Sequence, residues 1–310
     1  MVAQNLDYVA FNILLDDLVF PDGQTRMEVL GGGGPQTALG MRLWSDRVGL
    51  VGGVGQDFPR PAEDWLQQAG IDCQGLRRSE LPTARAWQVT ETSGLRTQVW
   101  RVGPEVIRGQ LQRRLEYLPS DYRQAKGYHL GVHPLSADYD FIAGLVDLGG
   151  VVSVESFCPA ARQLDADGLK KLVGAADIFS LNEHEARSLV GEGQPQQLAQ
   201  RLLDAGARLL CLRLGAAGAL VADSAARQAF CIPACAVPVV DVVGAGNAFC
   251  GGFLAGWCQT GNLLTAGICG AVAASFLVEQ VGLPVFSSRL VQEAQRRLEG
   301  LRLDVTPVNL

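Results

Sequence analysis

The residues from Asp241 to Asn247 have the composition of an anion-binding turn. A branched apolar run ends at Asp241, a short glycine turn follows, and a helix of small residues is expected to begin at about Ala245. The backbone N–H groups of Gly244, Ala245, Gly246 and Asn247 would then point into one space at a helix N-terminus. Such an arrangement binds anions, and phosphate above all.

Asn247 stands where a phosphoryl-transfer site of this shape needs a carboxylate to take the proton of the acceptor hydroxyl. A general base typically contributes about 10²–10⁴-fold to the rate. Most of the work in a loose phosphoryl-transfer transition state is positioning and charge stabilisation, which the turn could still supply. An amide cannot accept the proton, although its oxygen can orient a hydroxyl. The sequence therefore predicts slow transfer and does not require an inactive site.

Three further motifs have both a functional and a purely structural interpretation. The glycine run 31–34 permits a close backbone approach to a ligand, or it is a flexible connector. Asn182 and Glu185 have the spacing of a helix capping box, which alone explains the pair. Gly215 and Gly218 flank a turn after an apolar run, and most such turns are only hairpins.

The elements that must position these motifs alternate between strand-like and helix-like segments. This rhythm predicts a mostly parallel sheet with helices on both faces. The expected strands are 8–15, 48–54, 71–76, 127–131, 151–154, 177–181 and 208–214, and the expected helices are 36–44, 61–69, 137–148, 167–173, 184–190 and 195–205.

Two segments interrupt this rhythm. Residues 16–30 are strand-compatible with a Pro-Asp-Gly turn at 21–23, and residues 83–102 read as two strands joined by Thr92-Ser93-Gly94. Together they predict a small antiparallel sheet outside the main one, a lid over a cleft. Trp87 and Trp100 lie on these strands and either stack on a ligand ring or pack the lid.

The bulk composition is that of an ordinary globular protein, and it argues against several classes of function. The chain has 310 residues, 48% of them apolar and 19% charged, and a net charge of −6. No basic stripe is visible, so no nucleic-acid partner is expected. The uncharged stretch 242–278 is a poor membrane span because Gly-Asn at 261–262 divides it into two helices.

Eight scattered cysteines without a CxxC pair indicate a reducing, cytoplasmic compartment rather than a disulfide framework or a zinc site. The histidines at 129 and 133 flank the end of an expected strand and are interpreted as core residues.

Taken in order, these motifs resemble the ribokinase-like, or PfkB, family of carbohydrate and nucleoside kinases. The resemblance runs from about Tyr8 to Leu283. The family pattern Asp-Thr-x-Gly-Ala-Gly-Asp-x-Phe-x-x-Gly-Phe stands here as Asp-Val-Val-Gly-Ala-Gly-Asn-Ala-Phe-Cys-Gly-Gly-Phe at 241–253. Gly-Leu-Arg-Thr at 94–97 is similar to the lid turn of the family. The chain looks like a divergent branch, with Asn247 at the position of the catalytic base and Glu155-Ser-Phe in place of Asp-Pro-Asn.

The resemblance implies a role for each matching residue. The substrate-holding Asp falls on Asp17, with Asp16 as its rival one step away. The remaining assignments are Gly31, Gly32 and Gln36 for substrate, Asn182 and Glu185 for magnesium and phosphates, Gly215 and Gly218 for nucleotide, Gly244 to Asn247 for the anion hole, and Asp241 as the residue that leads it.

The resemblance further implies a single ribokinase-like α/β domain over residues 1–310, with a lid from roughly 14–30 and 83–103. It implies ATP-dependent phosphorylation of a hydroxymethyl group on a sugar-like or nucleoside-like molecule, with Mg²⁺ and Glu185 at the metal, and a homodimer through the lid. Asp241, another acid, water or phosphate itself would then receive the proton. Two alternatives stay open: a nucleotide or sugar binder without turnover, acting as sensor or scaffold, and unrelated chemistry on the same scaffold.

Overall fold

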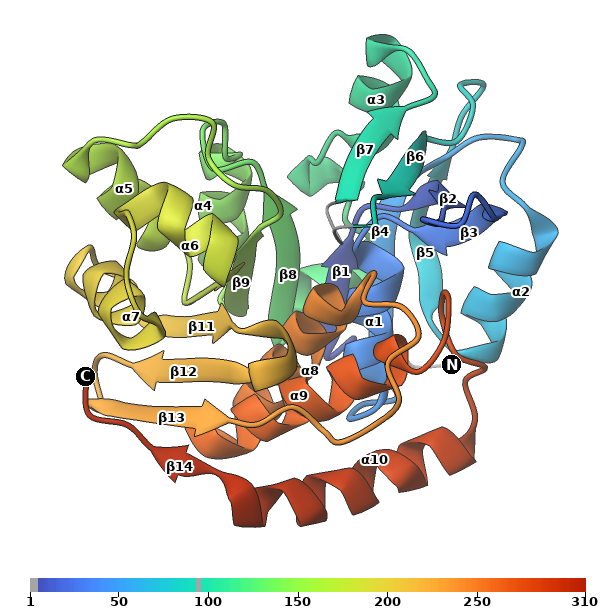
Figure 1. Ribbon diagram of the computed structural model, residues 1–310. Helices are drawn as coiled ribbons and strands as arrows, with labels where there is room; N and C mark the ends of the chain where they lie inside the picture. The colour runs from blue at the N-terminus through green and yellow to red at the C-terminus, as the bar shows by residue number, and fades with distance from the viewer. Residues whose placement is uncertain (1–4, 93–95) are drawn as a thin grey trace.

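The computed structural model describes residues 5–92 and 96–310, and its centre is a ten-stranded sheet (Figure 1). The strands of this sheet are β1 (Tyr8–Phe11), β4 (Val48–Val54), β5 (Asp72–Arg78), β8 (Gly127–Val132), β9 (Val151–Ser156), β10 (Ile178–Asn182), β11 (Leu209–Arg213), β12 (Ala219–Asp223), β13 (Gln228–Ile232) and β14 (Thr306–Pro307).

The strand order is β14-β13-β12-β11-β10-β9-β8-β1-β4-β5. All pairs from β11 to β5 are parallel, whereas β12, β13 and β14 pair antiparallel at the other edge. The mostly parallel sheet predicted from the sequence is confirmed. The carboxyl ends of its parallel strands meet at one edge, where open α/β sheets bind their ligands.

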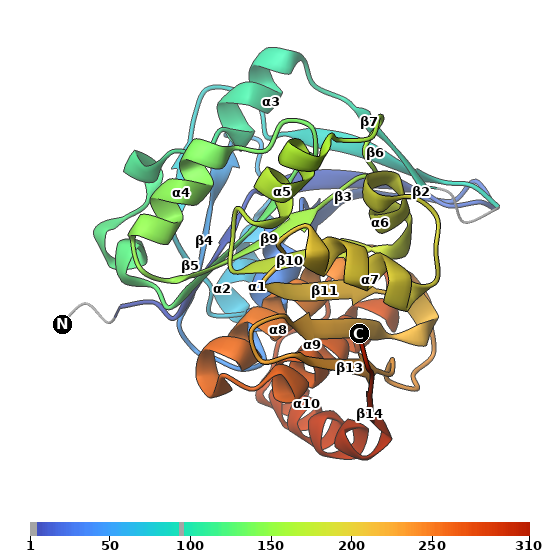
Figure 2. The same ribbon diagram turned by 90° about the vertical axis from the view of Figure 1, so that its left-hand side faces the viewer.

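Helices cover both faces of the sheet, as Figure 2 shows from the side. One face carries α1 (Gly34–Arg42), α2 (Arg60–Gln68), α8 (Ala245–Thr260) and α9 (Leu263–Val278), and α10 (Ser288–Leu301) packs against α9 from outside. The other face carries α4 (Tyr139–Asp147), α5 (Ala166–Val173), α6 (Glu183–Val190) and α7 (Pro195–Asp204). Helix α3 (Pro104–Leu111) contacts β4. Each face has its own buried apolar core.

The uncharged stretch forms α8 and α9, which pack against each other and against α1. Small residues allow this approach: a Cβ atom on Gly251 would overlap the carbonyl oxygen of Thr37 in α1. Gly261, with φ 60°, ends α8, and the side chain of Asn262 then caps α9 by accepting a hydrogen bond from the amide of Thr265. Within the described residues, no helix combines the length and the apolar character that a membrane crossing requires.

The first expected strand, 8–15, is wrong as one element. Asn12 takes a left-handed backbone, with φ 72°, and turns the chain out of the main sheet. Residues before it form β1, and those after it form β2 (Leu14–Val19) of a second sheet.

That second sheet is the predicted lid. It has the order β3-β2-β6-β7, with β3 (Thr25–Gly31), β6 (Arg85–Thr90) and β7 (Arg96–Trp100). It is mixed rather than antiparallel throughout, because β2 and β6 pair in parallel. Residues Gly94 and Leu95 of the expected lid turn lie outside the described residues.

Candidate active site

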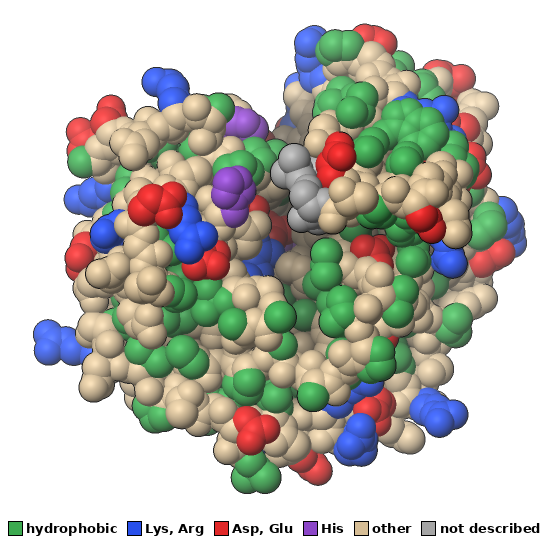
Figure 3. Space-filling view, in the orientation of Figure 1, with side chains coloured by type: hydrophobic (Ala, Val, Ile, Leu, Met, Phe, Trp, Pro, Cys, Tyr) green, Lys and Arg blue, Asp and Glu red, His purple; other side chains and the backbone are tan. Residues whose placement is uncertain are grey.

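The N-terminus of α8 lies at the carboxyl edge of the parallel strands and contacts β9 and β10 through its first turns. Figure 3 shows the molecule hollowed on this side, between the lobe that carries α4 to α6 and the lobe that carries the lid, with acidic and basic atoms visible inside the hollow. Asn247, Glu155 and Gly33 meet at this place.

The turn before α8 has the geometry that an anion site needs. Gly244 is the N-cap in a left-handed conformation, with φ 81°, which glycine adopts without strain. Ala248 is the first residue to donate its amide to the Gly244 carbonyl, at 3.0 Å. The amides of Gly246 and Asn247 precede this bond and stand in the first turn, where helical N–H groups lack an intrahelical acceptor.

The Asp241 side chain stabilises the start of this turn. Its Oδ1 accepts a hydrogen bond from the amide of Val243 at 3.0 Å. Its Oδ2 is buried and has no hydrogen-bond partner among the described residues. One carboxylate oxygen therefore lies buried beside the turn without a partner among the described residues.

The side chain of Asn247 donates a hydrogen bond from Nδ2 to Oε1 of Glu155. Glu155 lies near the end of β9, is 3% exposed, and is the residue that replaces the usual Asp at this point of the family pattern. Gly33 of the glycine run lies against the same amide, because a Cβ atom there would be 3.1 Å from Nδ2. The glycine run and the anion turn thus meet at Asn247.

Glu155 is also the centre of a buried polar cluster. Nη1 of Arg213, from the end of β11, lies 2.8 Å from Oε2, and Nε2 of His129 lies 3.5 Å from Oε1. The His129 ring is fixed on its other side, where Nδ1 lies 2.9 Å from the hydroxyl of Ser153. Burial by itself would raise the pKa of Glu155, but the charge and the hydrogen bond of Arg213, together with the nearby His129 ring, lower it to about 2. The Glu155 side chain is therefore ionised at neutral pH.

His129, Glu155 and Cys250 offer ligand atoms within 4.8 Å of one another, the spacing of a candidate metal centre. Two observations argue against a metal there. Arg213 already supplies positive charge, 2.8 Å from Glu155 and 3.9 Å from Sγ of Cys250. Burial raises the pKa of the Cys250 thiol, which keeps its proton and lies within donor reach of Ser180 at 3.3 Å.

The sequence assigns Asp17 to the substrate, and in the structure its carboxylate is surrounded by protein partners. The Asp17 side chain is fully buried. Arg85 donates two hydrogen bonds to its carboxylate, at 2.6 and 2.8 Å, and Arg101 contacts the same carboxylate. The backbone amide of Glu28 donates a further hydrogen bond to it at 2.9 Å. Burial would raise the pKa of Asp17, but these partners, Arg85 first, lower it. The Asp17 carboxylate is committed to holding the lid together.

Its neighbour Asp16 points to the other face of β2, because successive side chains of a strand alternate. Oδ2 of Asp16 lies directly against Gly31, where a Cβ atom would overlap it. Its Oδ1 accepts a hydrogen bond from Gln88 at 2.9 Å, and the side chain is 4% exposed. Asp16, not Asp17, borders the glycine floor.

Gln36 and Gly32 have structural tasks at the start of α1. Oε1 of Gln36 accepts the amide of Gly33 at 3.1 Å, and a Cβ atom on Gly244 would lie 2.6 Å from Cγ of Gln36. Gly32 has φ 94° and lies against the backbone of Leu14. The Gln36 side chain therefore packs against the anion turn at Gly244 and does not line open space.

Asn182 and Glu185 form the capping box that their spacing predicts. Oδ1 of Asn182 accepts the amide of Glu185 at 2.9 Å, and Oε2 of Glu185 accepts the amide of Asn182 at 2.7 Å. Oε1 of Glu185 accepts Nδ2 of Asn182 at 2.8 Å, and Arg213 lies 3.5 Å from Oε2. Both oxygens of Glu185 thus take part in hydrogen bonds, and its assignment to magnesium stays a prediction.

Gly215 and Gly218 flank a short 3₁₀ turn, η3 (Gly215–Ala217), in the hairpin between β11 and β12. Gly215 has open space beside it, and Gly218 has φ 90°. The hairpin interpretation is confirmed, and the turn closely follows Arg213 in the sequence.

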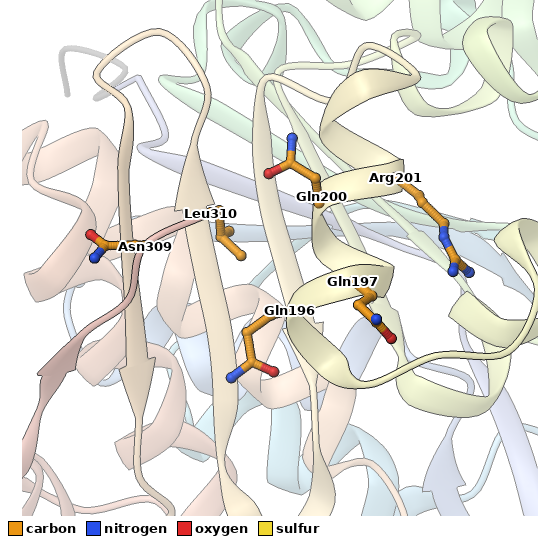
Figure 4. Close-up of a pocket in the computed structure, with 6 residues that line it drawn as sticks. All are labelled: Gln196, Gln197, Gln200, Arg201, Asn309 and Leu310. Carbon is orange, nitrogen blue, oxygen red and sulfur yellow. The ribbon is translucent and has the colours of Figure 1, made fainter.

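Two other hollows lie elsewhere. One, of about 390 Å³, is lined by α7 and the C-terminal residues Asn309 and Leu310 (Figure 4). The other, of about 540 Å³, lies among residues of α4 and α5, and includes Gly206. Neither contains a residue that the sequence singled out for chemistry, so the groove at α8 remains the candidate site.

Sequence reasoning missed Arg213 and Cys250 and interpreted His129 as a core residue. His129 is indeed buried, at 2% exposed, but it belongs to the polar cluster around Glu155. The sequence does contain a signal for Arg213, because it is a charged residue at the end of an apolar strand. Strand-end polar residues of different strands meet only when the strand order is known.

The chain is similar to known kinases over most of its length. The family model described as pfkB family carbohydrate kinase matches residues 16–287. The chain is 30% identical over 259 residues to the cytidine kinase of Thermococcus kodakarensis, covering 81% of this chain and 88% of that protein. It is 28% identical over 277 residues to the ATP-dependent ribose-1-phosphate kinase of Halopiger xanaduensis, covering 84% and 86%.

Among solved structures, the fold is similar to that of aminoimidazole riboside kinase from Salmonella enterica complexed with aminoimidazole riboside and an ATP analogue. The TM-score is 0.75, at 20% identity, over 94% of this chain and 99% of the other. The likeness at this identity concerns the fold. Together with the family match, it identifies the chain as a member of the pfkB family of carbohydrate kinases.

Proposed function

We propose that the protein transfers the γ-phosphoryl group of ATP to a hydroxymethyl group of a small sugar-like or nucleoside-like acceptor. The observation that carries this proposal is the first turn of α8. Its left-handed Gly244 cap presents main-chain amides at the carboxyl edge of the sheet, across from Asp16 and the glycine floor. A helix N-terminus stabilises the charge of a transferring phosphoryl group without reorganisation.

Asp16 is the group we assign to the acceptor. Its carboxylate borders the glycine floor beside Gly31, and charge-assisted hydrogen bonds between a carboxylate and sugar hydroxyls are strong. Gly31 and Gly32 let Asp16 and the backbone of Leu14 approach closely, because a Cβ atom at either glycine would overlap them. The nucleotide lies on the other side, near the exposed turn from Gly215 to Gly218.

The acceptor class is suggested by two relatives. One is named a cytidine kinase and the other a ribose-1-phosphate kinase, and both names denote a ribose-containing acceptor. We therefore place ribosides first among the candidate acceptors, and ketohexoses second because another relative, 28% identical, is a fructokinase from Klebsiella pneumoniae.

Asn247 orients the acceptor hydroxyl but takes no proton. Asp241 keeps one buried carboxylate oxygen without a partner among the described residues, and we assign it to receive the proton, directly or through water. Mg²⁺ belongs to the proposal as the counter-ion that neutralises the nucleotide phosphates. The amide at 247, in place of a carboxylate, predicts a slow enzyme.

A second candidate function is binding without turnover. It is favoured by the contact between Asn247 and Glu155, which ties the amide to a buried cluster instead of leaving a base at the turn. A sensor or scaffold would need only the binding half of the site.

The deciding experiment combines calorimetry with a turnover assay. Magnesium ATP is titrated into the protein alone, and then in the presence of cytidine, ribose-1-phosphate and fructose, and ADP formation is measured for each. Acceptor-dependent ADP formation supports the kinase. Nucleotide binding without turnover on any acceptor supports the second function, and absence of nucleotide binding refutes both.

We also propose that two copies associate through the lid. The lid keeps apolar side chains in solvent, with exposed fractions of 46% for Met27, 49% for Val99 and 37% for Trp100. These side chains lie on the two edge strands of the lid, β3 and β7, and an exposed sheet edge can pair with another copy of the chain. Analytical ultracentrifugation of the wild type and of Val99→Glu tests the proposal, since a dimer through the lid would dissociate in the variant.

A further inference from the structure

We propose that Glu155 is a positioning residue that fixes the orientation of Asn247 and requires an amide at that position. The inference rests on the proposed kinase function, because it assigns Asn247 to the acceptor hydroxyl. It is drawn from the side-chain contact between the two residues, from the burial of Glu155 and from the charges around it.

The orientation of the Asn247 amide follows from chemistry. An ionised carboxylate only accepts hydrogen bonds, so the atom that faces Glu155 must be the amide nitrogen. The carbonyl oxygen then points away from Glu155, and none of the hydrogen bonds among the described residues uses it. A hydroxyl that approaches the first turn of α8 therefore meets a fixed acceptor atom.

Arg213 stabilises the position and the charge of Glu155 beside Asn247. It contacts Glu155 at 2.8 Å and Glu185 at 3.5 Å, and it also lies against the first turn of α8, where a Cβ atom on Gly246 would overlap Nη1. One cation thus holds two carboxylates, and Glu155 stays ionised. An uncharged amide at 247 completes the cluster without adding charge.

A carboxylate at position 247 would add a negative charge to the cluster of Arg213, Glu155 and Glu185. Its oxygen would face Oε1 of Glu155 at hydrogen-bond distance, and two carboxylates so close cannot both ionise without a large rise in one pKa. Arg213 already contacts both Glu155 and Glu185, so its charge is shared before a third carboxylate is added. An aspartate at 247 would hence keep its proton in the folded state, and it would be no better as a base than the asparagine.

The experiment compares wild type, Asn247→Asp, Glu155→Gln and the double variant. In Asn247→Asp the new carboxyl has a raised pKa in the folded state. Its protonated form is favoured by folding, so the variant loses stability relative to wild type as pH rises above about 4, the unfolded pKa of Asp. We expect the Tm difference from wild type to widen by about 2–4 °C or more between pH 4.5 and pH 8.

The double variant removes the second carboxylate, so its Tm difference should not widen in this way. If the wild type turns over, we expect kcat of Asn247→Asp to fall at least about tenfold. The double variant should recover kcat with a new rise of rate with pH, because the carboxyl introduced at position 247 then ionises. Glu155→Gln alone should lower kcat more than it changes KM for ATP.

Matched controls are Asn262→Asp and Glu299→Gln. Asn262 caps α9, where an aspartate caps equally well, and Glu299 is exposed on α10. Neither control should change Tm with pH by more than wild type. A Tm difference for Asn247→Asp that stays flat from pH 4.5 to pH 8, or a kcat above that of wild type in this single variant, would overturn the inference.

The stability measurement needs only Asn247→Asp and Asn262→Asp, so it decides the charge argument even if Glu155→Gln fails to fold. It also separates this inference from the proposed function. A wild type without turnover refutes the kinase while the pH-dependent Tm still tests the pairing of Glu155 with residue 247.

Discussion

We assign different tasks to the adjacent residues Asp16 and Asp17, and a pair of amide substitutions tests this assignment. Asp16→Asn should reduce kcat/KM for the acceptor by about 10–100-fold, as expected when a charged hydrogen-bond acceptor for a hydroxyl is lost, with little change in Tm. Steady-state kinetics with the acceptor varied at saturating ATP is the measurement.

Asp17→Asn is the matched control, and it should lower the stability of the protein rather than kcat/KM for the acceptor. Arg85 and Arg101 would lose their buried partner, so unfolding should become easier by about 1–3 kcal/mol. The folded pKa of Asp17 is lowered, so its contribution is present above about 3.9, the unfolded pKa, and is lost as pH falls further. An acceptor-specific kinetic defect in Asp17→Asn with normal stability would reverse the two assignments.

The choice between these residues shows what the sequence can and cannot predict about a site. Strand alternation places Asp16 and Asp17 on opposite faces, but which face meets Gly31 depends on the pairing of β2 with β3. The anion turn at 244–247 was predictable because all its atoms come from one short segment. The cluster of His129, Glu155 and Arg213 was not, because its members come from three strands.

Arg213 should make the stability of the protein depend on pH in a predictable direction. The pKa of Glu155 is about 2 in the folded state and about 4.3 when unfolded, so the stability it contributes is complete above about 4.3 and is lost as pH falls toward 2. Arg213→Met removes the cation, and burial then raises the pKa of Glu155 instead.

We expect Arg213→Met to cost about 3–5 kcal/mol at pH 7, the usual effect of breaking a buried ion pair, and less at pH 4. Urea unfolding at both pH values measures it. Arg208→Met, just before the same strand, is the control, since its pair with Asp177 is exposed and worth about 0–1 kcal/mol. Equal losses in both variants, or a larger loss of stability at pH 4, would contradict this account of the cluster.

At the scale of elements, the N-terminus of α8 can be tested against its own C-terminus. Gly244 and Gly261 both have left-handed backbones, with φ 81° and φ 60°. Alanine at either position should cost about 1–2 kcal/mol of stability through backbone strain. Gly244→Ala would also push against Gln36, whereas Gly261 has nothing within 4 Å of a Cβ atom.

Only the first substitution should weaken ATP binding, by about tenfold or more, because it displaces the first-turn amides. Isothermal titration with magnesium ATP distinguishes the two variants. Unchanged affinity in Gly244→Ala, at a stability loss equal to that of Gly261→Ala, would remove the anion turn from the proposed site.

Regular elements were largely predictable, and the exceptions have physical causes. The alternation of strands and helices from 127 to 214 appears in the structure with shifts of a few residues. The break at Asn12 escaped prediction because both sides are apolar and only the left-handed backbone separates them. The parallel pairing of β2 with β6 joins segments far apart in the chain, such as Leu15 with Arg85, and local pattern carries no information about such contacts.

At the scale of the whole molecule, the proposed site has two halves, with Asp16 on β2 of the lid and the turn at Gly244 at the start of α8, which packs on the main sheet. A ligand that binds the folded state alone stabilises it, by about 2.7 kcal/mol at a concentration roughly one hundred times its Kd. ATP and the acceptor should therefore raise Tm separately, and each increment should depend on its own half.

Asp16→Asn should keep the Tm increase with magnesium ATP and lose the additional increase with the acceptor. Gly244→Ala should show the converse, a reduced increase with ATP and a retained response to the acceptor. Differential scanning fluorimetry of both variants, with Gly261→Ala as control, measures the increments for each ligand. If one variant abolished both responses while remaining folded, the two ligands would share a single subsite, and the division of the groove between lid and sheet would be wrong.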